Sequence, residues 1–290
     1  MMMDKVLFGD NQFFAVSHLS DEKSREQAIR FKDDSAIIRV LDQAREVGIN
    51  TFMCTTHDRV SNICDYLREN PEKYRDFQIY PCMPYAHKYA NAVTENGYLG
   101  TIRKYVPGSY LGTFAKGGIA YVRKDFIGLM EILVDAEMKM FKGINTPVIF
   151  IQNVIVDLIL GLKMFEVFRE YDFYIRKKYN AEPGYITMNM PAMYEALCSV
   201  GIENPIICSS INKIGFRMSG GKELYEKYLT EKTFRPIAMQ VLAAGALYPQ
   251  EAIEYLGKFP KIESVLFGAS SKNHIRETKE LIETYLGSGK

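Results

Sequence analysis

Short apolar segments alternate with longer segments of helical periodicity along the whole chain. Each short segment is nearly continuous in apolar residues and ends in small or polar ones, which is typical of strands buried on both faces. Longer segments, such as SAIIRVLDQAREVG and PQEAIEYLGKF, repeat apolar residues at i, i+3, i+4 and i+7 and predict helices. The predicted strands are KVLFG from Lys5, NTFMCT from Asn50, FQIYPCM from Phe77, PVIFIQ from Pro147, GYITMN from Gly184, PIICSS from Pro205, PIAMQVL from Pro236 and SVLFG from Ser264.

The number and character of these strands predict an α/β fold. Apolar strands joined by helices form a parallel sheet that is covered on both faces, and eight strand–helix pairs are the number in a (β/α)8 TIM barrel. An open, doubly wound sheet is the alternative. That fold usually has a glycine-rich nucleotide turn after its first strand, and GDNQFFAVSH is not such a turn. We therefore expect a single barrel domain over residues 1–286.

A long segment separates the third and fourth predicted strands, where a barrel loop usually has about 2–6 residues. Its glycine-containing first part, residues 86–118, predicts an insertion that acts as a lid, or a surface excursion without a role in chemistry. The amphipathic run YVRKDFIGLMEILVDAEMKMF follows it and predicts the third barrel helix. The last residues, 287–290, read GSGK and are set apart as a candidate tag remnant.

Composition narrows the class of protein. Lys and Arg number 36 against 35 Asp and Glu, a formal net charge of +1 that does not indicate a nucleic-acid partner. The five cysteines have no CxxC spacing and lie in or beside apolar runs, which predicts buried thiols in a reducing compartment. We find no signal peptide, and polar residues interrupt the longest apolar run, 148–168. These features predict a cytoplasmic protein with a small-molecule substrate and no membrane partner, and they are compatible with a homo-oligomer.

Polar residues follow the predicted strands, and in a barrel the active site is built from these loops. Amides that point into an apolar barrel mouth cost about 1–3 kcal/mol when unpaired, so they either bind a ligand or pair with one another. The candidate substrate-binding residues are Asp10, Asn11, Gln12, Cys54, Tyr85, Gln152, Asn153 and Asn189, with Gln240 after the seventh strand.

Histidines supply the candidate catalytic groups. His18, His57, His87 and His274 all follow predicted strands, although a helix cap or a solvent-facing loop also explains such a position. We expect His57 to act as an acid or base, with Asp58 orienting it and Lys88 binding substrate charge; His87 is a further candidate. A divalent metal held by histidines and carboxylates is the less favoured alternative, because the chain has no HxH or HExxH spacing.

The stretch SVLFGASSKNHIRETKEL, from Ser264, predicts an anion site. An apolar strand ends at Gly268, and two serines then lead into a helix, so that backbone N–H groups and the positive end of the helix dipole converge. Lys272 and Arg276 add positive charge there. The alternative is a loop in which Ser271 only caps its own helix.

The carboxyl half resembles a known family. The runs PIICSSINKIGF, FRPIAMQVLAAGAL and KIESVLFGASSKNHIRETKELI are similar in order and spacing to strands 6, 7 and 8 of aldo/keto reductases, and LDQAREVGINTFMCTTHD resembles their helix 1 and strand 2. The likeness covers roughly half of the chain. It implies a nicotinamide dinucleotide, NADPH, along Ser209, Asn212, Gly245, Gly268, Ser270, Ser271, Lys272 and His274. From their positions after the seventh and eighth strands, we add Gln240 and Arg276 as further cofactor-binding candidates.

The catalytic residues of that family are absent at the matching positions. Aldo/keto reductases use an Asp that ends strand 2, a Tyr shortly after it, and a Lys and a His that end strands 3 and 4. In this chain, Cys54 stands at the position of the Asp and segment 58–60 at that of the Tyr. Segment 82–84 stands at the position of the Lys, and Gln152 with Asn153 at that of the His. We therefore expect an oxidoreductase-like barrel with changed catalytic residues, either His57 with Asp58 or Tyr85 with His87 and Lys88. A non-redox lyase, isomerase or metal-assisted hydrolase of a phosphorylated or carboxylated metabolite is one alternative, and a barrel that binds a ligand without catalysis is the other.

Overall fold

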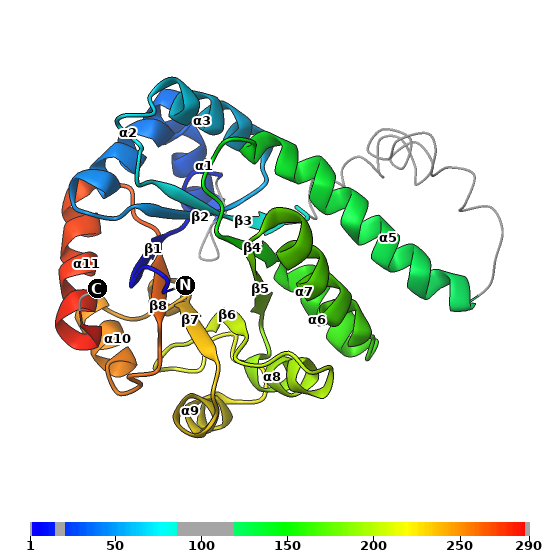
Figure 1. The fold of residues 1–290 in the computed structure, drawn as a ribbon. Helices are drawn as coiled ribbons and strands as arrows, with labels where there is room; N and C mark the ends of the chain where they lie inside the picture. Colours follow the sequence, from blue (N-terminus) through cyan, green and yellow to red (C-terminus); the bar gives the residue numbers. More distant parts are fainter. Residues whose placement is uncertain (1, 15–20, 86–118, 288–290) are drawn as a thin grey trace.

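The protein is described here by a computed structural model, which covers residues 2–14, 21–85 and 119–287. Eight parallel strands pair in chain order, and the first strand pairs with the last, so that the sheet closes into a barrel (Figure 1). This confirms the predicted (β/α)8 barrel. The strands are β1 Val6–Phe8, β2 Thr51–Thr55, β3 Gln78–Met83, β4 Val148–Ile151, β5 Glu182–Thr187, β6 Ile206–Ser210, β7 Arg235–Met239 and β8 Ser264–Phe267.

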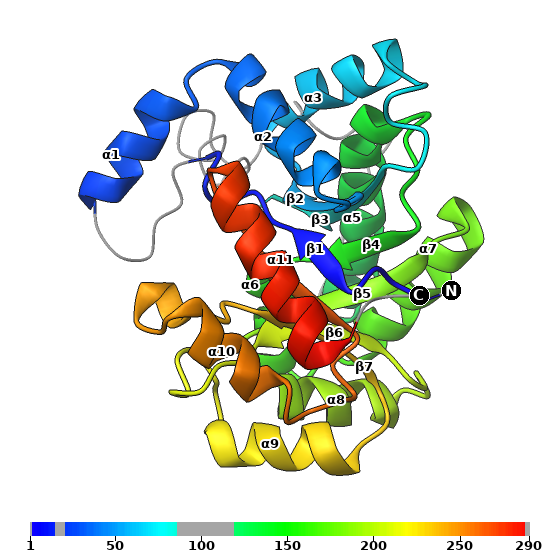
Figure 2. The ribbon, with the colours of Figure 1, turned by 90° about the vertical axis from the view of Figure 1, so that its left-hand side faces the viewer.

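Helices surround the barrel, and Figure 2 shows α11 packed along its side between α2 and α10. In the described part, β1 and β4 are each followed by two helices. The helices are α1 Asp21–Arg30, α2 Asp34–Glu46, α3 Asp58–Glu69, α5 Ile119–Met138, α6 Asn153–Gly161, α7 Glu166–Tyr179, α8 Met190–Ser199, α9 Lys222–Glu231, α10 Pro249–Leu256 and α11 Lys272–Leu286, with 3₁₀ turns η2 Lys139–Phe141 and η3 Ala243–Gly245.

The predicted third barrel helix is present as α5, which packs against α7 (Figure 1). The segment predicted to be a lid, 86–118, lies outside the described residues. No helix in the described ranges is long and apolar enough to span a membrane.

The core has two layers, because the strand residues alternate between the barrel interior and the helices. Tyr80 and Phe150 belong to the interior cluster, while Phe52 and Cys54 pack with the residues of the surrounding helices. The interior is tightly filled. A Cβ atom on Gly184 would lie 2.3 Å from the ring of Phe150, so that only glycine fits on β5 at this point.

The predicted buried thiols are present at Cys54, Cys64, Cys82 and Cys208, and all five cysteines are free. Cys198 is the exception, since it is exposed. It follows Ala196 and Leu197, which are buried on the inner face of α8, and therefore turns to the outer face of that helix.

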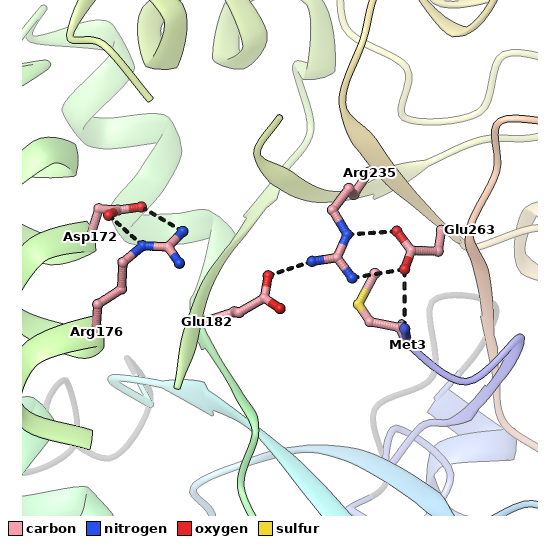
Figure 3. Close-up of polar contacts among 6 residues, drawn as sticks. All are labelled: Met3, Asp172, Arg176, Glu182, Arg235 and Glu263. Carbon is pink, nitrogen blue, oxygen red and sulfur yellow. Dashed lines mark hydrogen bonds and ion pairs between the residues drawn. The ribbon is translucent and has the colours of Figure 1, made fainter. Parts of the chain in front are cut away.

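Charged side chains close the barrel at the amino-terminal ends of its strands. Arg235, the first residue of β7, donates to Glu182 on β5 and to Glu263, which precedes β8; the two bonds to Glu263 are both 2.7 Å long (Figure 3). The backbone N–H of Met3 also donates to Glu263, at 3.1 Å. This network lies at the end of the barrel opposite the loops that carry the candidate site.

Candidate active site

Four side chains gather where the first three strands end: Asp10, Phe14, His57 and Tyr85, which we call the mouth cluster. Asp10 follows β1, and its Oδ2 accepts hydrogen bonds from the backbone N–H of Thr55, at 2.7 Å, and from its hydroxyl, at 2.6 Å. Thr55 is the last residue of β2, so this carboxyl group links the ends of two neighbouring strands.

Asp10 is only 7% exposed, and this burial dominates its chemistry. Removing a carboxylate from water disfavours its charged form. Burial therefore raises the pKa of Asp10 above its ordinary value, although the hydrogen bonds from Thr55 act in the opposite direction. The group is suited to hold a proton at a higher pH than a solvated aspartate does.

His57 is held in place by its backbone position and by its ring. It is the N-cap of α3, and its Nδ1 accepts a hydrogen bond from the N–H of Arg59 at 3.2 Å. The neutral imidazole with Nδ1 as acceptor carries its proton on Nε2. The ring stacks on Phe14 with centroids 4.3 Å apart. In the neutral form, His57 therefore carries its N–H on Nε2, in a ring that Arg59 and Phe14 orient.

Tyr85 follows β3 and faces His57, with the ring centroids 5.8 Å apart. Burial raises the pKa of Tyr85, and the charges of Asp10 and Asp58 raise it further. The hydroxyl consequently keeps its proton at neutral pH. It is a second donor beside His57 at the mouth.

The remaining predicted substrate-binding amides mostly bond to nearby protein groups. Gln152 donates to the carbonyl of Cys82 at 3.2 Å, Asn189 caps α8 by accepting from the N–H of Ala192 at 3.3 Å, and Gln12 donates to the carbonyl of Gly9 at 2.8 Å.

The other predicted substrate-binding residues differ in exposure. Asn11 is exposed and Asn153 begins α6. Cys54 is fully buried in the layer between the sheet and the helices, which leaves its thiol no direct access to the mouth.

The predicted cofactor residues after β6 and β7 form a buried hydrogen-bond network. Ser209 donates to the carbonyl of Thr187 at 2.8 Å, and Gln240 accepts from Ser210 at 2.6 Å. Asn212 exchanges hydrogen bonds with the backbone of Phe216. Such pairing among polar groups is the structural alternative that the sequence left open. Gly245 lies in the loop after β7 with a φ of 89°.

The loop after β8 ends in a helix start, as predicted. Ser271 is the N-cap of α11 and accepts from the N–H of His274 at 3.4 Å, while the ammonium of Lys272 lies 2.5 Å from a Glu46 oxygen. Gly268 faces Gln12, whose Oε1 would lie 2.0 Å from a Cβ at that position. The carbonyl of Ser270 accepts from Arg30. The cap is thus present, and it is compatible with an anion at the same helix end.

The donor set of this loop fits a phosphate group. It combines the amino-terminal end of a 15-residue helix, two serine hydroxyls and the cations Lys272 and Arg276. Lys272 is paired with a half-exposed glutamate, and surface pairs of this kind contribute only about 0–1 kcal/mol, so the pair can open at little cost.

Three predicted histidine and lysine positions cannot be placed, because His18, His87 and Lys88 lie outside the described residues. Asp58 is exposed at the start of α3. Within the described ranges, no three His, Cys, Asp or Glu side chains are grouped as a metal site would require.

Comparison with known proteins gives matches in structure only. No protein-family model matches the chain, and no curated protein matches it in sequence. A Pseudomonas aeruginosa protein described as a candidate aldo-keto reductase matches 97% of this chain and 91% of its own, at 12% identity and a TM-score of 0.58. An aldo/keto reductase from Brucella melitensis matches 96% of this chain and 88% of its own, at 10% identity and a TM-score of 0.52. The chain has an aldo/keto reductase-like fold.

One further neighbour was solved with a cofactor. A point mutant of the protein Gox0644, in complex with NADPH, matches 98% of this chain and 89% of its own, at 9% identity and a TM-score of 0.52. The aldo/keto reductase-like barrel thus extends over almost the whole chain, well beyond the carboxyl half in which the sequence resemblance is strongest.

Two residues of the site were missed by sequence reasoning. Phe14 orients His57, and Glu137 on α5 accepts hydrogen bonds from Thr56 and Tyr85. A weak signal existed for Glu137, because this acidic residue lies at helical spacing from the apolar Val134 and Phe141. Nothing in the sequence marked Phe14, because stacking depends on the path of the loop.

Proposed function

We propose that the protein is an NADPH-dependent oxidoreductase that reduces the carbonyl group of a small molecule at the barrel mouth. The mouth cluster is the observation that carries this proposal. In a barrel of aldo/keto reductase-like fold, it brings an oriented imidazole, a protonated phenol and a buried carboxyl group to the ends of three neighbouring strands.

The residues of the cluster have complementary roles in this reaction. Tyr85 and the Nε2–H of His57 donate hydrogen bonds to the substrate carbonyl oxygen, and one of them gives it a proton. Asp10 lies near Tyr85 and holds the ends of β1 and β2 together. NADPH, when bound, supplies the hydride that the carbonyl carbon receives, so that one hydride and one proton convert the carbonyl to an alcohol.

The loop after β8 is the proposed holding site for a cofactor phosphate. Ser270, Ser271, Lys272 and Arg276 would bind it, with His274 beside them. Along the rest of the cofactor we retain Ser209, Asn212, Gln240, Gly245 and Gly268 as proposed neighbours. The buried thiols and the balanced charge support a cytoplasmic enzyme with a small-molecule substrate.

Isothermal titration with NADPH tests the cofactor site. We expect micromolar binding by the natural chain and a loss of at least about tenfold in affinity for Lys272→Ala combined with Arg276→Ala, because each charged hydrogen bond contributes about 1.5–3 kcal/mol. Lys258→Ala is the matched control, since this exposed lysine follows α10, away from the loop. Absence of heat with NADPH would contradict the proposal and favour a non-redox lyase, isomerase or hydrolase.

Turnover of NADPH with a panel of small aldehydes and ketones tests the chemistry. Tyr85→Phe and His57→Gln should each lower kcat by about 10²-fold or more, since general acid catalysis contributes 10²–10⁴-fold. Their affinity for NADPH should not change. An unchanged rate in both variants would remove the cluster from catalysis, and NADPH binding without any turnover would instead indicate a ligand-binding barrel.

A further inference from the structure

Glu137 is a buried carboxyl group that contacts the two segments carrying His57 and Tyr85. It lies in the last turn of α5 and is 2% exposed. Its Oε2 accepts from the hydroxyl of Thr56 at 2.5 Å, and the backbone N–H of Tyr85 donates to Oε1 at 3.1 Å and to Oε2 at 3.2 Å. One side chain thus joins the segment after β2 to the segment after β3.

These contacts act on the backbone directly beside the two proposed donors. Thr56 is fully buried and precedes His57 in the chain, so its bond to Glu137 fixes the entry into the N-cap of α3. The bond to Tyr85 holds the N–H of that residue and not its hydroxyl. Glu137 can therefore set the spacing of the His57 and Tyr85 rings without using either functional group.

Packing alone does not explain an acidic residue here. The neighbouring positions Met130, Val134 and Met138 on the same helix are apolar and buried, and an apolar side chain would avoid the cost of burying a carboxyl group. The group is retained with hydrogen bonds from both loop segments, which is the arrangement expected of a side chain that orients an active site.

We propose that Glu137 is a positioning residue for the mouth cluster, acting through Thr56 and the backbone of Tyr85. The assignment of the cluster to carbonyl reduction rests on the proposed function above. The positioning of His57 and Tyr85 by Glu137 is independent of the proposed function, because it can be measured without a substrate. A misplacement of about 1 Å in an active site can lower the rate about 10²-fold, so the effect is measurable on turnover as well.

The experiment compares Glu137→Ala, Glu137→Gln and the control Glu131→Ala in the full-length protein. Glu131 lies on the same helix six residues earlier, and none of the hydrogen bonds that join the two loop segments involves its carboxyl group. Two nuclear magnetic resonance signals are followed: hydrogen exchange of the Tyr85 amide and the ¹⁵N shifts of the His57 ring, assigned with His57→Gln. NADPH affinity is measured in parallel.

For Glu137→Ala we expect Tyr85 amide exchange to be at least about tenfold faster and the His57 ring shifts to move, with NADPH affinity unchanged, since a removed hydrogen bond of about 1.5 kcal/mol corresponds to roughly tenfold. Glu137→Gln keeps an acceptor oxygen and should restore most of both signals. Glu131→Ala should change neither. Unchanged Tyr85 exchange and His57 shifts in folded Glu137→Ala would overturn the proposal.

If Glu137→Ala does not fold, Thr56→Val tests the same link, because it removes only the hydroxyl that donates to Glu137. Moved His57 shifts in this variant support the positioning role, and unmoved shifts refute it. Where the shifts move but the natural chain never oxidises NADPH, the positioning stands and the proposed reaction fails. Where turnover is measurable, kcat of Glu137→Ala should fall about 10²-fold and recover in Glu137→Gln.

Discussion

At the scale of single residues, burial sets the behaviour of Asp10. Desolvation raises its pKa in the folded protein above the ordinary value of 3.8. Its contribution to stability is therefore fully present below that value and is lost as the pH rises through the raised pKa. We expect Asp10→Asn to remove this loss, because the amide oxygen can still accept from Thr55. The free energy of unfolding of the variant should rise relative to the natural chain as the pH increases.

Urea unfolding at a series of pH values from about 3 to 8 measures the difference in free energy of unfolding between Asp10→Asn and the natural chain. This range includes the ordinary pKa of an aspartate and the region above it. Asp58→Asn is the comparison variant, since it removes an exposed carboxyl group at the same end of the barrel. If the Asp10→Asn difference does not change with pH, the carboxyl group of Asp10 is not held in a desolvated state.

At the scale of elements, the loop after β7 is strained. Ala243 and Ala244 have φ of 47° and 58°, while the following Ala246 has an ordinary helical φ of −74°. A left-handed conformation costs a residue with a Cβ about 1–2 kcal/mol. A substitution to glycine removes this strain, but it lowers the free energy of unfolding by about 0.4–1 kcal/mol because the unfolded chain becomes more flexible. Ala244→Gly should therefore raise the free energy of unfolding by about 0.5–1 kcal/mol.

The matched control is Ala246→Gly in the same loop, which relieves no strain and should lower stability by about 0.5–1 kcal/mol. Thermal or urea unfolding of both variants decides the point. Equal effects from the two substitutions would mean that the left-handed backbone carries no strain.

The elements also show which features of the structure can be predicted from the sequence. Apolar strands such as PIICSS can be read directly, because a parallel strand buried on both faces has no polar alternation. The helix start at Ser271 was readable from its serine and the following helical period. The contacts of Gln240 with Ser210 were not, because the left-handed φ of 53° at Gln240 turns its side chain in a way that strand periodicity does not encode.

The candidate site was predicted less well for the same physical reason. His57 and Tyr85 were recognised by their place after strands, which follows from the barrel. Their mutual orientation depends on Phe14 and on Glu137. Glu137 lies 81 residues from Thr56 and 52 from Tyr85 along the chain, and these groups become neighbours only when the barrel closes. Long-range contacts of this kind leave no periodic signal.

At the scale of the whole molecule, the network of Arg235 closes the end of the barrel opposite the site. Burial favours the neutral form of Glu263, but the hydrogen bonds from Arg235 and from the N–H of Met3 outweigh it, so the pKa of Glu263 is lowered. Its contribution to stability is present above the ordinary value of 4.5 and is lost as the pH falls. The Arg235 side chain is 13% exposed, so Arg235→Met should cost about 2–4 kcal/mol by removing the guanidinium group from between two half-buried glutamates.

Arg176 provides the control for this prediction, because Figure 3 shows it paired with Asp172 on the same helix, and its side chain is 52% exposed. Arg176→Met should therefore cost no more than about 0.5 kcal/mol. Urea unfolding at neutral pH should separate the two variants, and the Arg235→Met deficit should shrink as the pH falls below 4.5, where Glu263 becomes neutral in the variant and in the unfolded chain. A deficit equal to that of Arg176→Met would mean that the barrel closes without this network, and that apolar packing of its interior carries the closure alone.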